Sequence, residues 1–107
     1  MTLFEDIANL DRLVHEPARM SILTALSACQ EADFTFLMRL TGLTAGNLSG
    51  HLVKLKDAKL VHVEKQFLNN RPNTLARITP KGLAAIESHW KQLEELRQNA
   101  GEWKSEE

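Results

Sequence analysis

The sequence contains few of the residues that disulfide bonds, zinc centres and membrane spans require. Cys29 is the single cysteine among 107 residues, so no internal disulfide can form and no thiolate set for structural zinc can be assembled. No run approaches the roughly 18 consecutive apolar residues of a membrane helix, and Met1–Leu10 lacks the basic-then-apolar order of a secretory signal. We therefore expect a cytoplasmic protein without a membrane partner.

Motifs for catalysis and metal binding are also lacking. The histidines are scattered, and Glu87 with His89 is only a fragment of a metal-ligand set. Serine and histidine residues form no nucleophile motif, and no glycine-rich phosphate loop is present. Cys29 has no histidine near it, which is more typical of a small packed residue than of a redox sensor. We predict no enzymatic activity, no catalytic residue, no cofactor and no metal site.

The length and composition suit one compact unit. Hydrophobic residues make up 43% of the chain and charged residues 25%, which is close to the average of globular domains. A chain of 107 residues is too short for two independent cores. We predict a single domain over residues 1–107, with a flexible tail over residues 101–107.

The charges are unevenly distributed, although the net charge is only −1. Residues 44–82 carry seven basic and two acidic side chains, whereas residues 1–43 carry three basic and six acidic ones. Affinity for a phosphate backbone depends on lysine and arginine, so the central block is a candidate footprint for nucleic acid. Such a block is as often simply solvated surface, and the local pattern has to decide.

The spacing of apolar residues predicts three helices in the first part of the chain. A helical repeat within residues 1–15 ends at Pro17, which suits the first turn of a second helix. That second helix gives out in the polar stretch 27–33. A third helix over residues 34–42 ends at Gly42, because glycine readily adopts the left-handed conformation of a helix C-terminus.

A fourth helix follows directly and carries a clear buried stripe. Thr44 is a suitable N-cap for a helix over about residues 45–58. Leu48, Leu52 and Leu55 follow one another at steps of four and three residues, so they lie on one face. This face is predicted to pack on the other helices.

The pattern then changes from helical to alternating. Residues 61–66 alternate as in a strand, residues 69–73 have turn chemistry, and residues 74–78 form a second extended run. The two runs predict a β-hairpin with a basic, flexible tip. Thr79–Pro80 resembles an N-cap followed by proline, and it opens a long last helix that we expect to end at Gly101.

The third and fourth helices with the turn between them predict a helix-turn-helix, which the hairpin and last helix extend to a winged helix-turn-helix. The predicted fold is therefore mainly α-helical with one small β-hairpin (α+β). The second helix of such a pair offers its outer side to the DNA major groove. A step of about 100° per residue places Gly46, Asn47, Gly50 and Lys54 on or near that side, opposite the leucines.

The polar residues of this outer side have groups suited to DNA. The Asn47 amide can pair with adenine, and the Lys54 ammonium can reach phosphate or guanine. The alternative interpretation is that Asn47 and Ser49 only support the start of the helix and that His51 is a packed or solvated histidine. The predicted contacts are Thr44, Asn47, Ser49, Gly50, His51, Lys54 and Lys56.

The hairpin offers a second contact with DNA, over about residues 65–77. Arg71 lies in its predicted turn, with Lys65 and Arg77 on its arms. A cation there is suited to the adjacent minor groove or to phosphates, and the nearby asparagines can donate hydrogen bonds. An ordinary solvated turn is the alternative. The predicted contacts of this wing are Lys65, Arg71 and Asn73.

Five stretches of the sequence together carry a family resemblance. They are Leu10–Arg19 (LDRLVHEPAR), Ala32–Leu37 (ADFTFL), Leu43–Leu52 (LTAGNLSGHL), Asn70–Thr74 (NRPNT) and Ile78–Gly82 (ITPKG). These stretches resemble the small winged-helix regulators of the MarR/ArsR type, and the likeness extends over about residues 9–90. The resemblance implies a dimeric bacterial or archaeal transcription regulator whose fourth helix and wing bind double-stranded operator DNA.

The sequence departs from that family at a few positions. Gly50 stands in the recognition helix where similar proteins commonly carry a basic residue, and a single Arg71 lies between Asn70 and Asn73 in the wing. The alternative function is therefore a winged-helix protein-interaction module with little DNA affinity. The paired cysteines of arsenic-type sensors are missing, so no metal effector is expected, while a small-molecule or protein effector stays open.

A two-fold operator is read by a dimer whose half-sites lie about one helical turn apart. Apolar residues in the terminal helices, over residues 1–15 and 80–100, exceed what a small core needs. We predict homodimerisation through these helices; the alternative is that both fold back on their own domain. The predicted interface residues are Phe4, Ile7, Trp90, Leu93 and Leu96.

Overall fold

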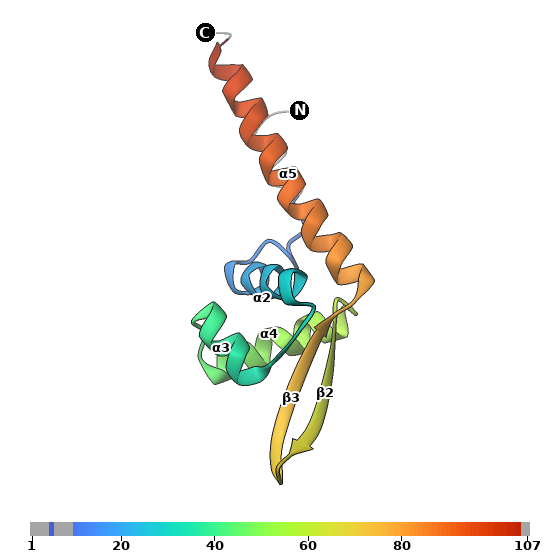
Figure 1. Cartoon of the computed structure of the whole chain (residues 1–107). Coiled ribbons are helices and arrows are strands. Elements are labelled where there is room, and N and C mark those ends of the chain that lie inside the picture. Colours follow the sequence, from blue (N-terminus) through green and yellow to red (C-terminus); the bar gives the residue numbers. More distant parts are fainter. Residues whose placement is uncertain (1–4, 6–9, 106–107) are drawn as a thin grey trace.

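The computed structural model describes Glu5 and residues 10–105 (Figure 1). In chain order its elements are α2 (Pro17–Cys29), β1 (Glu31–Asp33), α3 (Phe34–Thr41), α4 (Ala45–Asp57), β2 (Val61–Leu68), β3 (Arg71–Ile78) and α5 (Pro80–Ser105). The strands form an antiparallel sheet in the order β1-β3-β2. The predicted winged helix-turn-helix is confirmed: α3 and α4 are the helix pair, and the β2–β3 hairpin is the wing. Among the described residues, no helix has the length and apolarity needed to span a membrane.

Capping side chains set the starts and ends of the helix pair. The Asp33 carboxylate accepts a hydrogen bond from the backbone N–H of Phe36 and so caps α3. Gly42 ends this helix with a left-handed φ of 72°, a conformation that costs glycine little. The Thr44 hydroxyl accepts from the N–H of Asn47 and begins α4. The predicted ends of both helices are confirmed.

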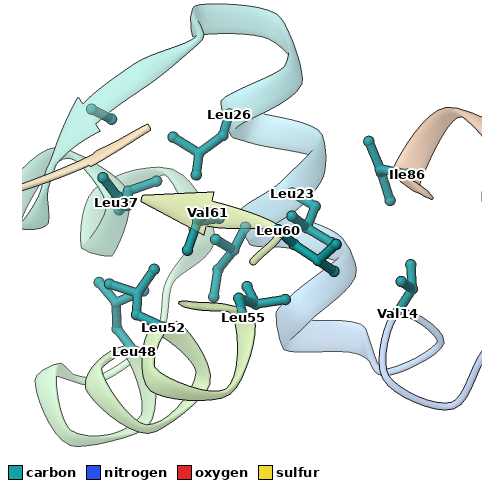
Figure 2. Close-up of a cluster of buried hydrophobic side chains, with 13 residues drawn as sticks. Val14, Leu23, Leu26, Leu37, Leu48, Leu52, Leu55, Leu60, Val61 and Ile86 are labelled. Carbon is teal, nitrogen blue, oxygen red and sulfur yellow. The ribbon is translucent and has the colours of Figure 1, made fainter. Parts of the chain in front are cut away.

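The core lies where the helices meet the base of the sheet. Figure 2 shows leucines of α2, α3 and α4 pointing toward one another and toward Val61 of β2, with Ile86 of α5 at the edge of the cluster. The leucine stripe predicted for α4 is buried, at 0–5% exposure. Burying such side chains stabilises a fold by about 1.5–3 kcal/mol each, so this stripe fixes which side of α4 faces outward. The buried leucines of the three helices are Leu23, Leu26, Leu37, Leu48, Leu52 and Leu55.

The start of α5 is tied to the end of α4. Thr79 donates its hydroxyl to the carbonyl oxygens of Lys59 and Leu60, at 2.8 and 3.0 Å, and accepts from the N–H of Gly82 at 3.0 Å. The predicted Thr79 cap is therefore confirmed. Gly82 packs so closely on Leu60 that an added Cβ would lie 2.9 Å from its carbonyl carbon and overlap its oxygen. Lys81 also donates to the Ala58 carbonyl at 3.2 Å.

The wing is longer and tighter than predicted. Its strands pair without interruption from Val61 opposite Ile78 to Leu68 opposite Arg71. Only Asn69 and Asn70 form the turn, with φ of 53° and 63°, as a two-residue type I′ turn requires. The predicted five-residue turn is therefore wrong, because asparagine tolerates positive φ and lets the strands pair up to the tip.

A short strand was not predicted at all. Residues Glu31–Asp33 form β1 and pair with Leu75–Arg77 of β3. The stretch looked like a loop because it is short and polar. Its strand conformation comes from pairing with β3, which is distant in sequence, and such pairing has no local signal.

The chain before α2 differs from the predicted helix over residues 1–15. The described part from Leu10 to Glu16 is a series of turns. Asp11 accepts from the N–H of Leu13 at 2.9 Å through its side chain and from the N–H of His15 at 2.6 Å through its carbonyl. A local side-chain bond of this kind competes with helix formation. Leu10 and other apolar residues of the segment are still buried, so the helical spacing arose from packing of turns.

The last helix also differs from the prediction. Helix α5 continues through Gly101 to Ser105, so neither the end at Gly101 nor a flexible tail over residues 101–105 is correct. One glycine inside a helix costs about 1 kcal/mol relative to alanine, which the helix-forming residues around it can offset. With 26 residues, α5 is about 39 Å long, and Figure 1 shows it extending well away from the helix pair.

Candidate nucleic-acid interface

The outer side of α4 is open to solvent. Asn47, Ser49 and Lys54 are exposed, and a Cβ added at Gly46 or Gly50 would meet nothing within 4 Å. The buried leucines hold the opposite side of the helix, so this face presents small and polar groups on a rigid support. The arrangement has the form that a major-groove reading helix needs.

Thr44 and His51 have partners inside the fold. The Thr44 hydroxyl caps α4 at 3.2 Å from the N–H of Asn47. The His51 ring is half-buried, and its Nδ1 lies 3.2 Å from Nη1 of Arg19 and 3.6 Å from Oε2 of Glu16. A guanidinium can only donate, so Nδ1 of a neutral His51 accepts this bond and the ring hydrogen is on Nε2. His51 is therefore held by α2 and has one nitrogen left for another partner.

Arg19 connects the turns before α2 to the recognition helix. It is 9% exposed and donates to the carbonyl oxygens of Leu13 and Arg12 as well as to His51. Glu16, the N-cap of α2, lies 3.9 Å from Nη1 of Arg19. Burial raises the pKa of the Glu16 carboxyl, but bonds from backbone N–H groups and the charges of His51 and Arg19 outweigh it, so the net pKa is lowered. The sequence did not reveal this network because its members are separated along the chain.

A groove of about 310 Å³ separates α4 from the wing. It brings together Ser49 and Lys56 of α4 with Lys65 of β2, three predicted site residues from two elements. Thr74 of β3 also lines it and was not predicted. Hydroxyl groups and ammonium groups on both walls are suited to a phosphate strand that runs between the helix and the wing.

The remaining predicted residues of the wing lie on its other face. Residues directly opposite each other in an antiparallel pair share a face, and successive residues alternate. Lys65 is paired with Thr74, whereas Arg71 and Asn73 are one position out of phase with that pair. Arg77 is not a free cation, since it binds Oε2 of Glu31 through Nε at 3.0 Å and Nη2 at 2.9 Å.

The predicted dimer residues of α5 have mixed surroundings. Trp90 is 47% exposed, and its indole N–H donates to the Thr24 hydroxyl of α2 at 3.0 Å. Leu93 and Leu96 are half-buried. Trp90 thus folds back on its own chain through one edge and presents the rest to solvent. Phe4 and Ile7 lie outside the described residues.

Two histidines connect α5 to the turns before α2. His89 is buried, at 2% exposure, and its Nε2 lies 3.0 Å from Nδ1 of His15. Burial and the nearby His15 lower the pKa of His89, while Asp11 acts in the opposite direction. The Nδ1 atom of His89 has no hydrogen-bond partner among the described residues. A neutral His89 fits these surroundings.

Cys29 and the acidic and histidine residues give no sign of a metal centre. Within the part of the chain that the structure describes, no three histidine, cysteine or acidic residues gather as metal ligands would. Cys29 is exposed, so its prediction as a packed residue is wrong. It lies at the end of α2, where its thiol donates to the Ala25 carbonyl at 3.2 Å.

Comparisons with known proteins agree with this geometry. The family model described as a winged helix DNA-binding domain matches residues 18–97. An uncharacterized protein of Methanocaldococcus jannaschii is 30% identical over 88 residues, which cover 82% of this chain and 96% of that protein.

Solved structures give the same result for the fold. A transcriptional regulator homologue from Pyrococcus horikoshii aligns with a TM-score of 0.83 and 25% identity over 94% of this chain and 98% of that one. A putative transcriptional regulator of the MarR family from Enterococcus faecalis aligns with a TM-score of 0.70 and 20% identity over 100% and 96% of the two chains.

Proposed function

Since the chain belongs to the family of winged helix DNA-binding domains and is a DNA-binding transcriptional regulator, we propose that it acts as a homodimer on a pseudo-palindromic operator. Helix α4 enters the major groove, and the wing lies over the adjacent minor groove or backbone. The observation that carries this proposal is the open outer side of α4, held outward by its buried leucines. Regulators of this family are not enzymes, and the proposal requires no cofactor.

The residues of α4 divide into base contacts and backbone contacts. Asn47 and Lys54 are exposed on the outer side, where an amide can pair with adenine and an ammonium with guanine or phosphate. Gly50 lets the helix backbone approach the base edges. Thr44 contributes by capping the helix, and His51 offers its free Nε2 to a phosphate.

Backbone contacts come from both walls of the groove between α4 and the wing. Ser49, Lys56 and Lys65 hold the phosphate strand that lies there, because they line one groove. Arg71 and Asn73 extend from the opposite face of the hairpin toward the minor groove or the next phosphates. Positioning by backbone contacts supplies much of the affinity in protein–DNA complexes.

The dimer interface is formed by the terminal segments. Helix α5 is 26 residues long and extends far beyond the core, which leaves much of its length available to a second copy. Trp90, Leu93 and Leu96 lie along it, and Phe4 and Ile7 are assigned to the same interface from the sequence. The Trp90–Thr24 hydrogen bond supports the competing arrangement in which this part of α5 serves its own chain.

We treat residues 1–107 as a single domain that acts in the cytoplasm, where its DNA is. A small-molecule effector has a candidate site in an apolar groove of about 760 Å³ between α2, α3 and α5. Such a lining is typical of small-ligand sites. The identity of the effector, and the choice between repression and activation, depend on partners other than this chain.

A mobility shift on the DNA upstream of the protein's own gene tests the proposal, with Asn47→Ala and Arg71→Ala as variants. We expect a specific shift that Asn47→Ala weakens about tenfold, the low end of a lost base contact. Arg71→Ala should reduce the salt slope by about one unit. Glu87→Ala, an exposed position on α5, is the control.

The contrary result is equally clear. If the wild-type protein gives no shift on any duplex at low salt, and instead binds a protein partner with little dependence on salt, the chain is an interaction module. Equal shifts by the wild type and Asn47→Ala would remove α4 from the interface.

A further inference from the structure

An aromatic side chain stands exposed near the tip of the wing. Phe67 is 75% exposed, the highest value among the large hydrophobic residues described as exposed. A single exposed apolar residue needs no special explanation. Phe67, however, lies on the element that is proposed to reach DNA, and neither the core nor the groove uses it.

The strand geometry determines the direction of this side chain. Val63 and Lys65 line the groove that faces α4, and Phe67 continues the same alternation on β2. Its partner in the register is Pro72 of β3, which therefore shares that face. Phe67 and Pro72 form a small apolar surface on the α4 side of the wing, beyond the groove.

The tip holds this surface in a defined position. The strands stay paired to Leu68 opposite Arg71, and the type I′ turn adds only two residues. Strand β1 covers β3 only at Leu75–Arg77, so β3 has a free edge at Pro72, where a proline is tolerated in a sheet. A short turn and a proline both reduce the freedom of the tip.

The charges around Phe67 indicate what it contacts. Lys65 lies two residues before it on the same face, and Arg71 lies at the end of the turn on the opposite face. A protein or a lipid surface would require a wider apolar area. A narrow apolar side chain between cations matches duplex DNA, where the cations meet phosphates and the ring meets a base step.

We propose that Phe67 is an apolar wedge that enters the minor groove beside the α4 site and partly opens one base step. This inference rests on the proposed function, which places the wing at that groove. Inserted apolar side chains of this kind kink the duplex by roughly 20–90°. Pyrimidine–purine steps such as TA open most easily, so Phe67 adds a preference for such a step at a position that α4 does not read.

The test uses a random pool of duplexes of about 30 base pairs, long enough for two half-sites one helical turn apart. Sequences bound by the wild type and by Phe67→Ala are selected and compared, and bending is measured by energy transfer between labelled ends. We expect the wild type to enrich a pyrimidine–purine step outside the α4 site and to bend the duplex. Phe67→Ala should lose both and bind about tenfold more weakly, the effect of one lost aromatic stack, with an unchanged salt slope.

Two further variants separate the wedge from general damage to the wing. Leu68→Ala removes an apolar side chain that is 53% exposed and points to the opposite face, so bending and affinity should stay at the wild-type level. Phe67→Met keeps an apolar side chain and should restore part of the bend. Phe67→Lys keeps an extended side chain without the wedge, so it should raise the salt slope but leave the duplex straight.

The outcomes also distinguish the wedge from the proposed function. If Phe67→Ala bends and selects DNA like the wild type while Asn47→Ala weakens binding, the wedge is wrong and the function stands. If the wild type selects no DNA from the pool, both are wrong. A loss of bending in Leu68→Ala equal to that in Phe67→Ala would also overturn the assignment to this face.

Discussion

The two ends of α4 have opposite surroundings, although one helix of 13 residues joins them. Beyond its C-terminal end, Gly82 of α5 packs so tightly on Leu60 that an added Cβ would overlap the carbonyl oxygen. Toward its N-terminal end, an added Cβ at Gly46 or Gly50 would meet nothing within 4 Å. One end is fixed by contacts within the chain, and the other is left open.

The contrast separates positions that hold the fold from positions that are free to serve a partner. A glycine without space around it is required by packing. A glycine with open space on a helix costs stability, by about 1 kcal/mol relative to alanine, without a packing benefit. Gly46 and Gly50 therefore point to the close approach of another molecule, and the DNA groove is that molecule in the proposed function.

The largest effect is expected at the closed end. Gly82→Ala places a methyl group where the Leu60 backbone lies, and a backbone atom cannot move aside as a flexible side chain can. We expect the free energy of unfolding to fall by about 4 kcal/mol or more, in the range of severe packing defects. Urea denaturation followed by circular dichroism measures this change.

Gly101→Ala is the matched control for that substitution. Gly101 lies in the same helix, and nothing is within 4 Å of its position. Alanine there should raise stability by roughly 0.5–1 kcal/mol because of its helix propensity. Equal effects of Gly82→Ala and Gly101→Ala would contradict the description of the joint between α4 and α5.

A second large effect is expected where α4 is tied to α2. Arg19→Met keeps much of the side-chain volume but removes the donors to Leu13, Arg12 and His51. Acceptors left unpaired in a buried site cost about 1–3 kcal/mol, and we expect a loss of about 2 kcal/mol in the free energy of unfolding. Chemical denaturation checks this value.

Arg12→Met at an exposed position is the control and should change stability by less than about 0.5 kcal/mol. If Arg19→Met is as stable as Arg12→Met, the network is not a support of α4. Because Arg19 also orients His51, its loss should weaken DNA binding more than the loss of stability alone explains.

A third effect depends on pH and concerns His89. Its lowered pKa means that the folded chain binds fewer protons than the unfolded chain once the pH falls below the ordinary histidine pKa of about 6.5. The free energy of unfolding should therefore decrease between about pH 7.5 and about pH 5.5. Glu16, whose pKa is also lowered, adds its own loss only at lower pH, because carboxyls ordinarily titrate near 4.3.

Urea midpoints at the two pH values measure this dependence. His89→Gln should reduce the pH dependence, because glutamine does not titrate. His62→Gln, at an exposed position on β2, should leave it unchanged. A pH dependence that persists in full in His89→Gln would assign the effect to another group.

Local signals predicted the parts of the fold that local chemistry controls. Asp33 was placed in a loop, yet the adjacent helix was predicted within about one residue, and the caps at Gly42, Thr44 and Thr79 are confirmed. These features depend on a few neighbouring residues. The leucine stripe of α4 was equally clear, since its period alone fixes the buried face.

Features that depend on distant residues were missed. Strand β1 exists because it pairs with β3, and Gly82 is essential because Leu60 lies against it. In the candidate site, the open side of α4 was predicted, but the anchoring of His51 by Arg19 was not. The position of Phe67 beside the groove also required the register of the wing.

The smallest expected effect tests the open end of α4 directly. Gly50→Ala adds a methyl group that meets nothing within 4 Å, so stability should rise by about 0.5–1 kcal/mol through helix propensity. If the backbone at Gly50 approaches base edges, the same methyl group should weaken binding to the operator. Gly101→Ala also raises stability but lies far along α5, so its DNA binding should be unchanged. A Gly50→Ala variant that gains stability and binds operator as well as Gly101→Ala would show that the open space is not filled by DNA.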